Sequence, residues 1–175
     1  MSVPETALSR MGPTEAAEEA GAAAGEQLRL VVFRLADEWF ALPIAEVREI
    51  QPLSEITRVP NAPPQILGIV NVRGHILTLL TLESLLGIPR AVPPTHAMIL
   101  DLGVPDPYVG VAIHGAAEVR RVPAADVEPS PAGPGGPGGL DGVLEIEGRV
   151  VGLLRLGRLL APWLSEWGVE AAALC

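Results

Sequence analysis

The sequence contains no lysine, because all twelve basic residues of the 175-residue chain are arginine. A Schiff-base lysine, a catalytic lysine and the lysine of a phosphate-binding loop are therefore excluded. The single cysteine, Cys175, cannot form an internal disulfide, so we expect a protein of the reducing cytoplasm. No apolar run reaches roughly 18 residues, which excludes a membrane-spanning helix. The N-terminus also lacks the basic and apolar regions of a secretory signal.

Acidic residues outnumber basic ones, and the formal net charge is −9. Residues 1–27 hold five acids against Arg10, and we predict a flexible acidic tail there. An acidic surface repels phosphate, so nucleic acid and anionic membranes are poor partners, and no direct membrane insertion is expected. Hydrophobic residues make up 49% of the chain against 19% charged, which is enough apolar surface for a compact core.

Short apolar segments separated by turn residues fill the chain from residue 28 to about residue 160. The pattern predicts strands over residues 28–34, 39–42, 66–72, 75–80, 97–102, 108–113, 116–122, 143–146 and 150–154. It predicts short helices over 82–86 and 156–164, and a helical turn from Pro43 through Ile50 with Glu46 pointing outward. The segment AGPGGPGG at 132–139 is predicted to be a flexible loop.

The strands fall into two blocks, near residues 28–82 and near residues 96–156. Closure of short strands into small barrels removes the sheet edges that would otherwise promote aggregation. We therefore predict a mainly β fold with two barrel-like subdomains and a core shared between them.

Three parts of the sequence resemble the CheW family of chemotaxis coupling proteins. They are FRLADEWFALPIAEVREI (33–50), ITRVPNAPPQILGIVNVRGHILTLLTLESLLG (56–87), and the pair MILDLG (98–103) and YVGVAIHGAAEVRRV (108–122). The second is the most specific, because the order VP…P…G(I/V)xNxRG in so few residues is hard to obtain by chance. The resemblance implies two intertwined SH3-like five-stranded β-barrel subdomains with short helices over residues 28–162, followed by a C-terminal tail at 163–175.

The resemblance also implies a function without catalysis and without a cofactor. A CheW-like adaptor couples the cytoplasmic tip of methyl-accepting chemotaxis receptors to the regulatory domain of a CheA-type histidine kinase. It would be recruited to receptor arrays at the inner face of the membrane. One alternative is a CheW-like module of a motility, pilus or development pathway that binds only one of these partners. The other alternative is an enzyme. However, the serines lack the GxSxG motif of a nucleophilic serine, and the glycine cluster lacks the GK[ST] ending of a phosphate-binding loop.

Family receptor-contact positions carry over onto residues of this sequence at a predicted groove between the barrels. With the residues that flank Arg73 at the predicted hairpin corner, they are Val47, Glu49, Gly68, Asn71, Arg73, Gly74, Gly110 and Val119. Arg73 is the main candidate, because a guanidinium can meet carboxylate or carbonyl groups of a partner helix. The alternative is that Arg73 forms an internal ion pair with Glu49 or Asp101.

Other residues support simpler interpretations. Val47 and Val119 also fit core positions, since valine is among the most buried residue types. The histidines, at positions 75, 96 and 114, match no local ligand spacing, so no metal site is predicted. Trp163 and Trp167, four residues apart, are expected to pack a C-terminal helix onto the body of the protein.

Overall fold

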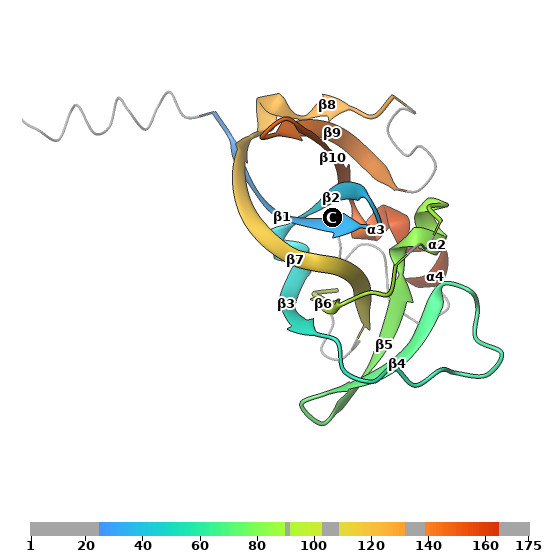
Figure 1. Cartoon of the computed structure of the whole chain (residues 1–175). Helices are drawn as coiled ribbons and strands as arrows, with labels where there is room; N and C mark the ends of the chain where they lie inside the picture. The colour runs from blue at the N-terminus through green and yellow to red at the C-terminus, as the bar shows by residue number, and fades with distance from the viewer. Residues whose placement is uncertain (1–24, 90–91, 103–108, 132–138, 165–175) are drawn as a thin grey trace, which may run out of the picture.

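The computed structural model describes residues 25–89, 92–102, 109–131 and 139–164 (Figure 1). Most of the two predicted tails, most of the 132–139 loop, and Trp167 lie outside these ranges. The strands are β1 (Gln27–Leu35), β2 (Glu38–Pro43), β3 (Val47–Pro52), β4 (Ile66–Val72), β5 (His75–Thr81), β6 (His96–Leu100), β7 (Val109–Pro123), β8 (Glu128–Pro129), β9 (Leu140–Ile146) and β10 (Arg149–Leu154). The helices are the 3-10 turns η1 (Ile44–Glu46) and η2 (Ala124–Asp126) and the α-helices α2 (Leu82–Leu86), α3 (Leu156–Leu159) and α4 (Ala161–Leu164). None of these helices is long and apolar enough to cross a membrane.

The strands form two barrels that share β7, which runs between them in Figure 1. In barrel A, the second half of β7 is followed in pairing order by β1, β2, β10, β9 and β8. In barrel B, β3 is followed by β6, the first half of β7, β5 and β4. A bridge between Thr57 and Ile69 joins β4 to the segment that follows β3. The prediction of a mainly β fold with intertwined barrels is confirmed.

Strand β7 is continuous over 15 residues, although the sequence pattern divides it into two strands at Gly115. Gly115 has φ +84°, a left-handed conformation that favours glycine. The β1–β7 register also shifts between Val32 and Arg34, close to the same point. The irregularity therefore lies where β7 passes from one barrel to the other.

Each barrel combines strands from both sequence blocks. Strands β1 and β2 come from the first block, yet they belong to barrel A with strands of the second block. Strand β2 pairs in parallel with β10, with Ala41 opposite Leu153. Strand β6 comes from the second block and pairs with β3 of the first. The hairpins are specified by local turn residues, whereas the β2–β10 and β3–β6 pairings depend on contacts between distant segments.

The predicted helical turn from Pro43 through Ile50 was also wrong beyond its first residues. Only Ile44–Glu46 is helical, and Val47–Pro52 forms strand β3. Valine and isoleucine favour strands, and pairing with β6 satisfies the backbone of this segment. Glu46, which was expected to point outward, is buried.

The predicted helix over residues 156–164 is divided into α3 and α4, with a bend at Leu160. Pro162 has no backbone N–H and is tolerated only in the first turn of a helix, so one continuous helix is disfavoured here. Trp163 packs against the core as expected.

Three apolar clusters form the core, and the largest joins the two barrels. This shared cluster combines side chains of β1, β2, β5, β6, β7 and β10 with side chains of α2 and α3. Phe33 and Phe40 lie within it, with ring centroids 6.5 Å apart. Smaller clusters fill the barrels themselves, around Leu30 in barrel A and Leu77 in barrel B. The predicted shared core is therefore present.

Candidate functional site

Arg73 and Gly74 form the two-residue turn between β4 and β5, and the tip of this hairpin extends away from barrel B (Figure 1). Their φ angles are +51° and +89°, as a type I′ hairpin turn requires. The backbone N–H of Gly74 donates a hydrogen bond of 2.8 Å to Oδ1 of Asn71, which stabilises the turn. A positive φ is uncommon for arginine, so the turn holds Arg73 in a defined but unusual conformation.

Two of the predicted residues meet as an ion pair. The guanidinium Nη1 of Arg73 lies 3.3 Å from Oε2 of Glu49 on β3, and the two side chains are 70% and 32% exposed. Glu49 also accepts a hydrogen bond of 3.0 Å from Nε2 of Gln51. The internal pairing considered for Arg73 therefore exists, with Glu49 rather than Asp101. Ion pairs at a protein surface contribute little to stability, so this contact holds Arg73 only weakly.

A small hollow of about 190 Å³ lies beside this ion pair. Its walls are the end of β3 and the following residues on one side, and the end of β4 on the other. Asn71 and Arg73 contribute to its rim, and Ala97 of β6 contributes to its lining. The predicted corner is therefore open to solvent.

The two predicted apolar contacts, Val47 and Val119, differ in exposure. Val47 is half-buried and packs against the shared cluster, while Val119 on β7 is 55% exposed. Val119 pairs in register with Val31 of β1, which is buried in that cluster. Both valines thus lie where the shared core reaches the surface, and Val119 is the one available for contact.

The two predicted glycines, Gly68 and Gly110, are buried and have packing roles. A Cβ on Gly68 would lie 2.5 Å from the carbonyl oxygen of Thr57 and 2.7 Å from Cγ2 of Ile56. A Cβ on Gly110 would lie 3.0 Å from Cδ2 of Leu77. These glycines permit close approach of neighbouring chain segments inside barrel B and do not offer surface to a partner.

Ile76 is an exposed apolar residue that the sequence analysis missed. It lies on β5 opposite Asn71, and 60% of its surface is exposed. Leu77 and Leu79 of the same strand are buried in barrel B, so strand alternation places Ile76 on the other face. The two faces of this strand can be assigned from the sequence. Because both faces of HILTLL carry apolar residues, however, the sequence does not indicate which of the two is exposed.

Buried Glu46 connects the start of β3 to the C-terminal helices. Its Oε2 accepts a hydrogen bond of 3.0 Å from the backbone N–H of Leu156, the first residue of α3. Burial raises the pKa of Glu46 above its usual value of 4.5, and this outweighs the opposing effects of the Leu156 hydrogen bond and of Arg155. The carboxylate therefore caps a helix and fixes the segment that leads into Val47.

The raised pKa of Glu46 makes stability depend on pH in a defined direction. The folded protein holds this proton more tightly than the unfolded chain, so the stabilisation is present below pH 4.5 and is lost as the pH rises through the raised pKa. Glu46→Gln keeps an acceptor for Leu156 but cannot ionise. We expect the thermal midpoint of Glu46→Gln, relative to that of the wild type, to increase as the pH rises from about 4.5 to neutrality. Parallel curves for the two proteins would contradict this, and Glu46→Ala, which lacks the acceptor, is expected to be less stable throughout.

The buried histidine His114 has a structural role. Its Nδ1 accepts a hydrogen bond of 3.0 Å from the N–H of Ala36, so Nε2 carries the proton in the neutral ring and donates to the carbonyl of Val92 at 2.7 Å. Nearby, the hydroxyl of Thr81 lies 2.7 Å from Oε2 of Glu83. Among the residues that the structure describes, no three His, Cys, Asp or Glu side chains are placed so that they could hold a metal ion.

A second hollow, of about 530 Å³, lies on barrel A and outside the predicted set of residues. Three carboxylates, those of Asp126, Glu128 and Glu145, line it together with Val150, which is 72% exposed. This hollow is a separate surface from the hairpin corner of barrel B. It is acidic, whereas the corner carries the cation Arg73.

The fold is a pair of intertwined barrels with an open hairpin corner where distant segments meet. A family model described as the CheW-like domain matches residues 29–162. The chemotaxis protein CheW of Rhizobium meliloti is 33% identical over 129 residues, which cover 73% of this chain and 83% of the relative. Protein FrzA of Myxococcus xanthus is 32% identical over 134 residues, 73% of this chain and 82% of the relative. The crystal structure of the scaffolding protein TtCheW from Thermoanaerobacter tengcongensis covers 77% of this chain and 93% of its own, with a TM-score of 0.64 and 26% identity. The chain therefore belongs to the CheW-like family.

Proposed function

We propose that this protein is a chemotaxis-type adaptor that couples methyl-accepting receptors to a CheA-type histidine kinase. The observation that carries the proposal is the hairpin corner, where exposed Arg73 pairs with half-buried Glu49 beside an open hollow. Ile76 on the same hairpin adds exposed apolar surface. Charged groups that fix orientation beside apolar side chains that supply contact area are the arrangement that a docked helix requires.

In this proposal, the helical hairpin of a receptor tip rests against the corner, and Arg73 turns from Glu49 to a carboxylate or carbonyl group of the helix. The exchange costs little, because Arg73 is exposed and a surface ion pair of this kind is weak. The kinase regulatory domain would bind a different face, for which the acidic hollow of barrel A is a candidate. Each contact can be modest in strength, since an array of many copies raises the effective affinity.

Arg73→Ala is expected to weaken binding of a receptor-tip fragment by about tenfold or more. The change removes the cation that orients the partner, while the protein loses only an exposed ion pair and should keep its thermal midpoint. Isothermal titration with the cytoplasmic hairpin of a methyl-accepting receptor from the same genome measures the first effect, and a thermal melt measures the second.

Arg58→Ala is the matched control, because it removes the same charge from an exposed position in the loop between β3 and β4. It should bind the fragment as the wild type does. If the folded Arg73→Ala protein bound equally well, the hairpin corner would not be the receptor site. If the wild-type protein bound neither the receptor fragment nor the kinase regulatory domain, the coupling function itself would be wrong.

A further inference from the structure

Two arginines lie directly opposite each other on barrel A. Arg29 of β1 and Arg121 of β7 are register partners in the antiparallel β1–β7 pair, and both are exposed. Opposed side chains of antiparallel strands stand on the same face, with Cβ atoms about 5 Å apart. Two arginine side chains thus leave the sheet from neighbouring positions on a protein whose formal net charge is −9.

Neither arginine has a carboxylate partner among the residues described by the structure. Its arginine ion pairs there involve Arg48, Arg73, Arg120, Arg149, Arg155 and Arg158. The acid nearest to Arg121 along β7 is Glu118, which is held by Arg120 at 3.0 Å. Strand alternation places Arg120 and Arg121 on opposite faces, so this acid is directed away. Like charges directly opposite each other destabilise a strand pair, and here nothing in the described chain compensates for them.

The arginine pair continues an exposed strip that begins at the shared core. Residues two apart on a strand share a face, so Arg121 lies on the face of Val119, and Arg29 on the face of Val31. Val31 is buried in the shared cluster, while Val119 is 55% exposed. The strip therefore passes from buried apolar to exposed apolar and then to cationic surface. We define the cationic strip as Val119, Arg121 and Arg29.

We propose that the cationic strip binds carboxylate side chains of the receptor helix whose apolar stripe lies on Val119. The inference rests on the proposed function and adds the chemistry of the partner, namely acidic residues next to its apolar contact. Each guanidinium can bind a carboxylate with two parallel hydrogen bonds. Acids three or four residues apart on one face of a helix are close enough to meet both arginines. An isolated cationic strip on an acidic protein also orients an acidic partner during approach.

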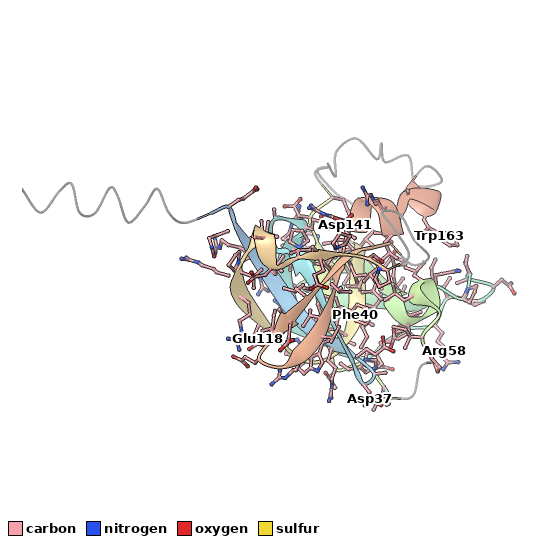
Figure 2. The ribbon with its side chains drawn as sticks, turned by 90° about the horizontal axis from the view of Figure 1, so that it is seen from above. Asp37, Phe40, Arg58, Glu118, Asp141 and Trp163 are labelled. Atoms are coloured by element: carbon pink, nitrogen blue, oxygen red, sulfur yellow. The ribbon has the colours of Figure 1, made fainter. Side chains whose placement is uncertain are left out.

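The test compares two double variants that remove the same charge. Arg29→Gln/Arg121→Gln removes the strip's cations, whereas Arg34→Gln/Arg58→Gln removes two exposed arginines elsewhere. Arg34 lies on the opposite face of β1 by alternation, and Figure 2 shows Arg58 on the opposite side of the molecule from Glu118 of β7. Full-length proteins are titrated with the receptor hairpin fragment at ionic strengths of about 0.05 M and about 0.5 M.

We expect Arg29→Gln/Arg121→Gln to bind about tenfold more weakly at the lower ionic strength, with a smaller difference from wild type at the higher one. The control variant should stay within about twofold of wild type. The thermal midpoint of Arg29→Gln/Arg121→Gln should be unchanged or raised at low salt, because a repulsive pair has been removed. A lowered midpoint would indicate a structural role and would overturn the inference.

Other outcomes separate this inference from the function on which it rests. If the wild type binds and Arg29→Gln/Arg121→Gln binds equally well at both ionic strengths, the inference is wrong and the adaptor function stands. If the wild type does not bind the fragment, both the inference and the proposed receptor binding are wrong. If Glu15→Gln/Glu18→Gln/Glu19→Gln binds the fragment more tightly, and Arg29→Gln/Arg121→Gln does so too, then the chain's own N-terminal acids occupy the strip. That result would overturn the receptor as its occupant.

Discussion

Gly68→Ala is expected to lower the free energy of unfolding by about 3 kcal/mol. The added Cβ would lie 2.5 Å from the carbonyl oxygen of Thr57, a backbone atom that cannot rotate away. Thr57 is held in place by two hydrogen bonds to Ile69, of 2.9 and 2.8 Å, which form the bridge beside β4. Relieving the clash must break this bridge and displace the wall of barrel B. Urea denaturation with a two-state fit measures the loss.

Gly142→Ala in barrel A is the matched comparison, because its Cβ would lie 2.7 Å from the carbonyl oxygen of Glu128. We expect a similar loss of stability from both changes. At a temperature where both variants remain folded, only Gly68→Ala should weaken receptor-tip binding, since the hollow beside Arg73 belongs to barrel B. A Gly68→Ala protein as stable as the wild type would contradict the close approach seen here.

Phe33→Ala is expected to lower the free energy of unfolding by about 4 kcal/mol. Phe33 has no exposed surface, and its ring packs against Phe40 within the cluster that joins the barrels. Figure 2 shows Phe40 in the middle of the molecule. Since both barrels pack on this cluster, native-state hydrogen exchange should show loss of amide protection in strands of barrel A and barrel B together.

Leu77→Ala provides the contrast, because Leu77 lies in the smaller cluster inside barrel B. Its loss should lower protection mainly in β4, β5 and β6. Should Phe33→Ala fail to fold, Phe33→Leu gives a milder test, with an expected cost of about 1.5 kcal/mol. Loss of protection in only one barrel would show that the shared cluster does not couple them.

Much of the local structure could be predicted from the sequence, because short-range signals specify it. The β4–β5 hairpin was predicted from two apolar segments around Arg73-Gly74, and positive φ angles at both turn residues explain that spacing. Helix α2 ends at Gly87, as predicted, and this glycine adopts φ +72° at the C-cap. In both places a glycine that adopts a positive φ angle marks the end of the element in the sequence.

The pairing of strands across long sequence distances could not be predicted in this way. Nothing in the local pattern of β2 indicates β10 as its neighbour, because this pairing arises from the shared core. The same limit applies to the candidate site. The exposure of Ile76 and the direct opposition of Arg29 and Arg121 follow from strand register, which only the folded arrangement specifies.

The sharing of β7 also has a consequence for how the protein is made on the ribosome. Barrel B lacks a central strand until residues Val109–Pro123 have been synthesised, and barrel A further requires β10, which ends at Leu154. During translation, the hairpins β1–β2 and β4–β5 therefore emerge before the strands β6, β7 and β10 that complete their sheets. Barrel B can close once β7 has been synthesised, whereas β1 and β2 of barrel A must wait for β10 before their sheet is complete.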